Sequence, residues 1–230
     1  MRLLHLWTCI LCAGVIFSGA SKSDAALLFP GAPLFPAPAG ANPFPTLVVD
    51  SLVQPFSAAP LYTGVLTTWV LQEAPADNPL LGLTFVFEVS NDATSLDPIH
   101  RLTVNNFANF LVDASYFITT TELAPSLIDR SVAGTVGFHF IGVPSMPGEL
   151  SPGMTTAFLV ARTDAPQYVP TFASVIDGTV TSVPSFSPAP LVPEPGSVAL
   201  LGIGATGLAG YVFWRRTRRA ENARDYMRLS

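Results

Sequence analysis

The side chains with the clearest potential for chemistry lie in one loop, Asn91-Asp-Ala-Thr-Ser-Leu-Asp97. Asn91, Asp92, Ser95 and Asp97 supply several oxygen ligands, and calcium prefers oxygen-rich, flexible sites. The spacing differs from that of an EF-hand, which also needs a central glycine and a closing glutamate. Side chains of these types equally hydrogen-bond to the backbone in turns. The sequence therefore predicts a turn, with calcium binding by Asn91, Asp92 and Asp97 as the alternative.

Signals for catalysis are scarce. The sequence contains no Gly-x-Ser-x-Gly elbow, no His-Glu-x-x-His and no phosphate-binding loop. His100 and His139 are too few for most histidine-based metal sites, and we interpret both as solvated strand residues. Carboxylates for glycoside hydrolysis must be paired by the fold, and the acids here are scattered singly. We therefore assign no catalytic residue and expect a protein that is not an enzyme, with a hydrolase as the alternative.

The charge of the central part of the chain limits its partners. Between Ala26 and Pro193 there are three basic residues, all arginine, against twelve Asp and Glu, a net charge of −9. Nucleic-acid binding requires clustered Lys and Arg, so this acidic surface excludes it as a function of the body.

The N-terminal end has the pattern of a secretory signal peptide. Arg2 precedes the apolar run 3–17, which is followed by the small residues Ser-Gly-Ala20. Cleavage after Ala20 or after Ala25 fits a small-x-small site, and we assign residues 1–25 to the signal peptide. An uncleaved N-terminal anchor is the alternative. Both cysteines of the chain, at positions 9 and 12, lie within this segment, so the mature body has no disulfide and no thiolate metal site.

Residues 26–60 are rich in proline, which disfavours helices and central strands, and we predict an extended arm or linker there. Its four phenylalanines, at positions 29, 35, 44 and 56, are expected to dock on the protein's own body, because exposed phenylalanine is a liability in a secreted protein.

The segment 61–183 is predicted to form the folded body. Short runs rich in β-branched and aromatic residues alternate there with turn residues, which is the strand signature. Leu83, Phe85, Phe87 and Val89 recur at period two and predict a core-facing side. Asp177-Gly178 predicts a hairpin between the last two strands. Without helical periodicity, these runs favour an all-β fold, an antiparallel β-sandwich.

The C-terminal end is typical of a membrane-spanning segment. A second proline-rich linker, 184–192, leads to Pro193-Glu194-Pro195. Nineteen uncharged residues, 196–214, follow. As a helix this run spans roughly 28 Å, close to the hydrocarbon thickness of a bilayer. We expect a single transmembrane helix, in which Gly202, Thr206 and Gly210 form a stripe of small residues that lets another helix approach.

An arginine cluster after the apolar run sets its expected orientation. Four arginines occupy five positions, 215, 216, 218 and 219. Basic flanks resist translocation, so Arg215, Arg216, Arg218 and Arg219 predict that residues 220–230 form a cytoplasmic tail and that the body lies outside.

The C-terminal pattern resembles the PEP-CTERM sorting signal of exported bacterial proteins. The resemblance rests on Pro193, Glu194 and Pro195, the glycine-broken apolar helix and the arginine cluster, and covers 193–219. It implies recognition by exosortase, a membrane enzyme thought to cut near the triplet. This chain continues past the arginines further than family members usually do. A permanently anchored single-pass protein is the alternative.

The expected function follows from this destination. The resemblance implies a protein held briefly in the inner membrane and then passed to the cell surface or the extracellular matrix. We expect a structural or adhesive role, without a cofactor and with extracellular polysaccharide as a candidate partner. A carbohydrate- or calcium-binding module on the same sandwich is the alternative.

Overall fold

A computed structural model describes residues 27–39, 42–44, 46–142 and 148–189, together with 203, 204, 206–208, 210, 211 and 215. The chain divides into two compact units, Met1–Ala189 and Pro190–Ser230. The first unit contains all the strands that the structure describes, and we refer to it as the body.

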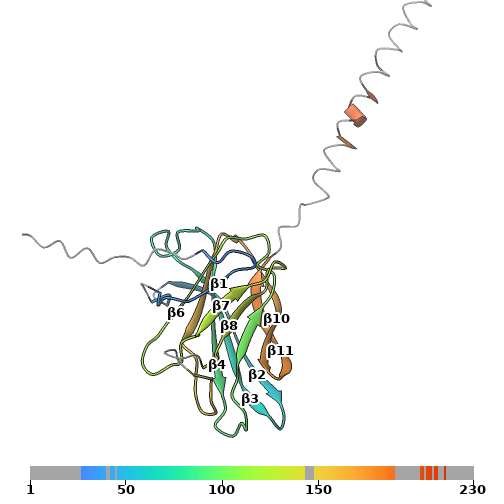
Figure 1. Cartoon of the computed structure of the whole chain (residues 1–230). Helices are drawn as coiled ribbons and strands as arrows, with labels where there is room; N and C mark the ends of the chain where they lie inside the picture. The colour runs from blue at the N-terminus through green and yellow to red at the C-terminus, as the bar shows by residue number, and fades with distance from the viewer. Residues whose placement is uncertain are drawn as a thin grey trace, which may run out of the picture. The chain divides into compact units, whose positions relative to one another are not determined.

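The body is built from β-strands (Figure 1). In chain order they are β1 (Pro33–Leu34), β2 (Leu47–Ala58), β3 (Tyr62–Gln72), β4 (Thr84–Asn91), β5 (Arg101–Val104), β6 (Val112–Phe117), β7 (Leu127–Arg130), β8 (Val136–His139), β9 (Phe158–Thr163), β10 (Tyr168–Asp177) and β11 (Thr179–Pro188).

The strands form two antiparallel sheets. One sheet has the order β1-β7-β8-β5-β10-β11, and the other has the order β2-β3-β4-β9-β6. Residues of both sheets meet in one apolar cluster, to which Phe85 and Phe87 of β4 and Phe138 of β8 belong. The predicted all-β fold with two antiparallel sheets around a shared core is therefore confirmed.

The alternation predicted for β4 is confirmed. Leu83, Phe85, Phe87 and Val89 are all buried in the shared core. Residues of one strand face point to the same side of the sheet, so these four side chains fill the space between the sheets. The predicted hairpin is confirmed as well, because β10 and β11 pair along their length and the chain reverses at Gly178, whose φ is +63°.

The body begins earlier in the chain than the sequence predicted. Residues 26–60 were expected to form an arm or linker, but β2 occupies twelve of them and pairs with β3. The proline at position 55 misled the prediction, since proline is tolerated on an edge strand and β2 is one. The body also ends later, because β11 continues to Pro188, inside the expected linker 184–192.

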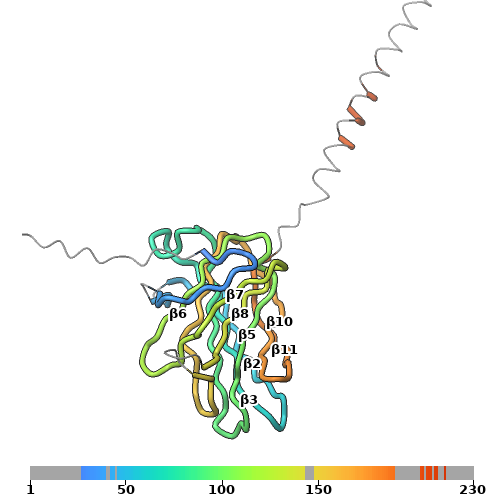
Figure 2. Tube along the Cα trace, in the orientation of Figure 1, coloured from blue at the N-terminus to red at the C-terminus, as the bar shows by residue number. Residues whose placement is uncertain are grey.

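An N-terminal strap, residues 27–39, runs across both sheets (Figure 2). Leu27 and Pro38 form bridges to β6, and β1 between them pairs with β7 of the other sheet. The strap thereby covers the outer edges of β6 and β7, which would otherwise expose unpaired backbone groups.

Docking of the four phenylalanines is only partly as predicted. Phe44 packs on Trp69, and Phe56 is buried in the shared core. Phe29 and Phe35 of the strap are 65% and 71% exposed, so the prediction is wrong for these two. They lie beside the short strand β1, where the strap contributes backbone hydrogen bonds to the sheets instead of apolar packing.

The C-terminal unit is described at eight residues only, and these are helical. Among the described residues, no helix is both long enough and apolar enough to cross a membrane. The predicted signal peptide 1–25, the triplet 193–195 and Arg216, Arg218 and Arg219 lie outside the described residues. Arg215 is described, helical and exposed.

Candidate functional site

The outer face of the five-stranded sheet, the side turned away from the shared core, carries an aromatic cluster, a buried arginine network and a polar groove. Its centre is apolar, where Val86 of β4 and Val160 of β9 are fully buried. Trp69, Phe158 and Phe44 pack over them, and the Trp69 and Phe158 rings lie 5.7 Å apart in an edge-to-face arrangement. Polar groups flank this aromatic cluster along the strands.

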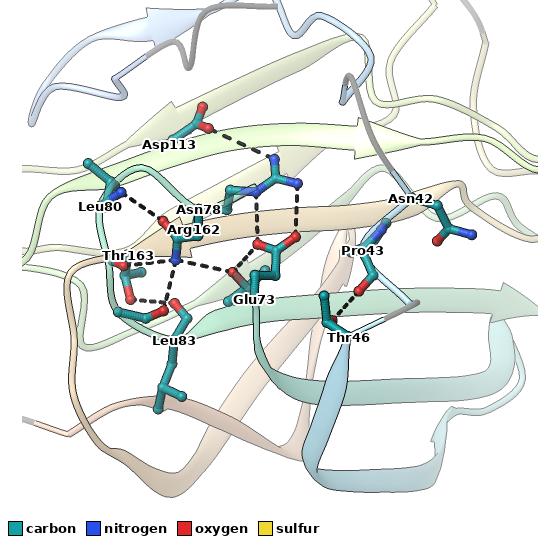
Figure 3. Close-up of polar contacts among 12 residues, drawn as sticks. Asn42, Pro43, Thr46, Glu73, Asn78, Leu80, Leu83, Asp113, Arg162 and Thr163 are labelled. Carbon is teal, nitrogen blue, oxygen red and sulfur yellow. Dashed lines mark hydrogen bonds and ion pairs between the residues drawn. The ribbon is translucent and has the colours of Figure 1, made fainter. Parts of the chain in front are cut away.

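A buried arginine lies at one end of the outer face (Figure 3). Arg162 of β9 donates from Nε and Nη2 to the carboxylate of Glu73, over 2.9 and 3.1 Å. Its Nη1 lies 4.0 Å from Asp113 Oδ2 of β6. Arg162 and Glu73 are each only 5% exposed. A buried ion pair is tolerated only when its geometry is good and its remaining groups are hydrogen-bonded.

Further hydrogen bonds complete this arginine network, which comprises Glu73, Asn78, Thr84, Asp113 and Arg162. The Thr84 hydroxyl donates to Glu73, and the Asn78 amide donates to Thr84 and to the carbonyls of Gly82 and Thr163. The network ties the end of β3 to β4 and β9. Because its carboxylates are buried and engaged, we interpret it as a structural element that fixes the strand ends.

A polar groove lies on the same sheet, beside the aromatic cluster. It has a volume of about 540 Å³. Its lining comes from β4, from the loop after β6 and from the segment before β9: Glu88, Ser90, Thr120, Thr121, Glu122, Gly153, Met154 and Thr155. The lining contains hydroxyl groups and two carboxylates but no basic side chain. It is therefore suited to a ligand that donates hydrogen bonds.

The two carboxylates of the polar groove have opposite environments. Glu122 accepts hydrogen bonds from the hydroxyl and amide groups of Thr119 and Thr120, which lower its pKa to about 2. Burial raises the pKa of Glu88, and the charge of Glu122 raises it further. Glu122 is thus a fixed anion that orders its loop, whereas Glu88 is the carboxyl group with acceptor capacity to spare.

The segment 91–97, predicted to form a turn with calcium binding as the alternative, is held by hydrogen bonds. The Asn91 amide donates to the carbonyls of Asp97 and Leu150, and Asp92 Oδ2 accepts from the Thr63 hydroxyl over 2.9 Å. Among the described residues no group of three or more His, Cys, Asp or Glu side chains could hold a metal ion. Asn91 ends β4, Asp92 and Asp97 follow in the loop, and the side chains of Asn91 and Asp92 are used to shape it.

His139 is not the solvated residue that the sequence predicted. Its side chain is only 16% exposed, and its Nε2 lies 3.1 Å from Asp129 Oδ2. Burial, followed by the nearby charge of Arg101, lowers the pKa of His139. Arg101 also pairs with Asp129, over 2.8 Å. Gly137 makes room for this pair, because a Cβ there would lie 2.3 Å from Asp129 Oδ1.

His100 also has partners that sequence patterns do not reveal. Its Nδ1 lies 2.7 Å from Asp177 Oδ1 at the hairpin end, and its Nε2 lies 3.3 Å from Glu149 Oε1. Burial raises the pKa of Asp177, and the positive charge of His100 opposes this effect. The three residues are 28 to 77 positions apart in the chain, so only the fold brings them together.

A second hollow, of about 400 Å³, lies where the strap meets β6. Arg130 of β7 lines it and is 4% exposed. Its guanidinium donates to the carbonyl of Leu28 in the strap and to those of Phe107, Ala108 and Phe110. Burial lowers the pKa of Arg130. Since backbone carbonyls take these donors, we interpret Arg130 as a clamp that holds the strap.

Comparisons with known proteins identify the C-terminal segment. The family model for the PEP-CTERM protein-sorting motif matches residues 191–219, which include Pro193, Glu194, Pro195 and the arginine cluster. No curated protein and no solved structure matches the chain. The match agrees in position and in its parts with the resemblance that the sequence showed. The chain is therefore an exported protein that carries a PEP-CTERM protein-sorting motif, the signal for exosortase-type sorting.

Proposed function

We propose that this protein is a structural or adhesive component of the cell surface or extracellular matrix, released from the membrane by cleavage at its Pro-Glu-Pro signal. The observation that carries the proposal is the sorting motif at 191–219, which directly follows a folded sandwich. In this proposal the body is the part of the protein that is exported and released. The C-terminal helix holds it in the inner membrane until an exosortase-type enzyme acts.

The arrangement of the chain supports access for such an enzyme. The last strand, β11, ends at Pro188, so four residues separate it from Pro193. Proteolytic processing requires a segment that can leave the fold, and the short, proline-rich sequence of this connection suits that requirement. The arginines at 215–219 hold the far end of the helix on the cytoplasmic side and so place the triplet near the outer surface.

The body supports a role in binding or architecture more than one in catalysis. Of its buried carboxylates, Glu73 and Asp113 belong to the arginine network and Asp177 is paired with His100. The partly exposed Asp129 is paired with Arg101. A general acid or base must reach the proton that it transfers, and buried, paired carboxylates do not meet that condition. Calcium binding and glycoside hydrolysis are the competing functions, and neither has a residue set in the described chain that we would assign.

The test is sorting in cells that contain an exosortase, compared with matched cells that lack it. We expect the wild-type protein to reach the medium or the outer surface only in the first case. Glu194→Ala removes the charge of the triplet and should leave full-length protein in the membrane fraction. Glu149→Ala is the control, because it removes an exposed glutamate of the body and should be sorted normally. Equal release of wild type and Glu194→Ala would contradict the proposal and favour a permanent anchor or another protease.

A further inference from the structure

The polar groove contains a carboxylate that the fold itself does not use. Glu88 of β4 is half-buried, and among the described residues no hydrogen bond or ion pair engages its carboxylate. Burial and the like charge of Glu122 both make the ionised form of Glu88 less favourable. Partly buried polar groups normally find partners within the protein or in bound molecules. Glu88 is therefore available to a ligand that donates hydrogen bonds.

The hydroxyl groups beside Glu88 broaden what the groove can recognise. Ser90, Thr120, Thr121 and Thr155 all line it. The Ser90 and Thr155 hydroxyls hydrogen-bond to each other and the Thr120 hydroxyl donates to Glu122, so these three groups offer a ligand mainly their remaining acceptor capacity. A hydroxyl both donates and accepts, whereas an ionised carboxylate only accepts. A ligand with many hydroxyl groups matches this hydroxyl wall, because each ligand hydroxyl can either donate a hydrogen bond to the wall or accept one from it.

An aromatic edge, formed by Trp69 and Phe158, lies on the same sheet face as Glu88 but outside the lining of the groove itself. The register that pairs Phe87 with Leu159 sets Glu88 beside Phe158 on the outer face. Two residues along β4, Val86 pairs with Trp69 on one side and with Val160 on the other. Phe44 packs edge-on against both rings, with centroid distances of 5.1 Å to Trp69 and 4.6 Å to Phe158. Trp69 and Phe158 are nevertheless only partly buried, so part of their ring surface stays exposed on the face that carries Glu88. Aromatic side chains combine a large apolar surface with a defined geometry, which suits the C–H face of a sugar ring.

We propose that the polar groove and this aromatic edge form a binding site for uncharged saccharide chains. Ring hydroxyls donate to Glu88 and exchange hydrogen bonds with the hydroxyl wall, while a neighbouring sugar face lies against Trp69 and Phe158. This inference deepens the adhesive role proposed above and rests on it for its biological meaning. Anionic saccharides are disfavoured, because the two glutamates line the groove and the body carries three arginines against twelve acids.

A metal ion fits the groove less well than a saccharide does. Four hydrogen bonds from Thr119 and Thr120 already occupy the oxygens of Glu122. That leaves Glu88 as the carboxylate with unused acceptor sites, whereas calcium takes six to eight oxygen ligands in general. The aromatic edge supplies no oxygen ligand for calcium, whereas a sugar ring uses both the hydroxyl wall and the aromatic edge.

The experiment measures binding of the full-length protein, in detergent micelles, to immobilised hexasaccharides of glucose, mannose and galactose, with a chitosan hexamer and a polyuronate beside them. We expect an uncharged hexasaccharide to bind best. Glu88→Gln should weaken that binding by roughly tenfold or more, since hydrogen bonds to charged groups are worth about 1.5–3 kcal/mol. Glu149→Gln makes the same charge change outside the groove and should bind like wild type.

Folding does not confound the result. Glu88→Gln removes a carboxylate that burial and like charge disfavour, so its thermal unfolding temperature should equal or exceed that of wild type. The proposal is overturned if no uncharged saccharide binds, if the chitosan hexamer binds best, or if Glu88→Gln binds as tightly as wild type. Glu88→Gln should also be sorted like wild type, so loss of saccharide binding and failure of sorting are separate outcomes.

Discussion

At the residue scale, the buried arginine network decides how well the strand ends of the five-stranded sheet are held. Arg162 reaches across the outer face to Glu73, which is 89 positions earlier in the chain. Sequence patterns identify neither residue, because a single arginine or glutamate within a strand belongs to no recognisable motif. Such a pair becomes visible only when the register of β4 and β9 places Thr84 opposite Arg162.

Replacing Arg162 with methionine should destabilise the body by about 3–5 kcal/mol, since it leaves a buried carboxylate without its cation. Thermal unfolding followed by near-ultraviolet circular dichroism measures the effect. The double variant Arg162→Met/Glu73→Leu is the matched control and should recover much of the loss, because no buried charge then remains unpaired. A single variant that unfolds like wild type would show that the network is not structural.

Glu122 gives the fold a defined response to acid. Its pKa falls from 4.5 to about 2 in the folded protein, so the fold favours its ionised form. The stability that it contributes is therefore present above pH 4.5 and is lost as the pH falls from 4.5 toward 2. Glu122 is largely exposed, so we expect a modest effect.

This effect can be measured as the difference in unfolding temperature between wild type and Glu122→Gln across pH 2–7. The difference should be largest near neutral pH and should shrink as the pH falls below about 4.5, the usual pKa of a glutamate. A constant difference over the whole range would mean that the Thr119 and Thr120 hydrogen bonds do not depend on the charge of Glu122.

At the element scale, strands with a clear period of two could be predicted and strands without it could not. β4 was found because apolar and polar residues alternate along it, and the β10–β11 hairpin was found because Asp177-Gly178 marks its turn. β7 has only four residues and β1 only two, which is too short for a pattern. β2 was missed because its proline at position 55 and the proline-rich stretch before it are typical of a linker.

The strap is the element whose position depends most on one side chain. Arg130→Met removes the guanidinium that donates to Leu28 and to the loop carbonyls at 107, 108 and 110. Buried acceptors left without donors cost about 1–3 kcal/mol each. We expect amide hydrogen exchange in residues 27–39 to accelerate by roughly tenfold or more, which corresponds to about 1.4 kcal/mol.

The control for the strap experiment is Arg101→Met, which removes an arginine of the same sheet that pairs with Asp129. Within the described part of the chain, the Arg101 guanidinium makes no hydrogen bond to the strap. Exchange in the strap should stay at the wild-type rate in this variant. If both variants loosened the strap equally, general destabilisation and not the clamp would be the cause.

At the scale of the whole molecule, the destination of the protein could be predicted from the sequence, whereas the chemistry of its body could not. The sorting motif is contiguous, because a membrane enzyme must read it in an extended or helical segment, so its residues stand in order in the sequence. The polar groove combines residues from positions 88 to 155, and its composition follows only from how the strands pair. A motif whose residues are consecutive can therefore be recognised in a single sequence, whereas a site assembled from several strands of a sheet cannot.

The central claim is that the C-terminal segment is a sorting signal that is cleaved off once the body has crossed the membrane. Intact mass spectrometry of the species outside the producing cells tests it most directly. We predict a product that begins after Ala20 or Ala25, ends close to Pro193-Glu194-Pro195 and lacks residues 215–230. Recovery of every molecule with its arginine cluster and C-terminal tail intact would contradict the account.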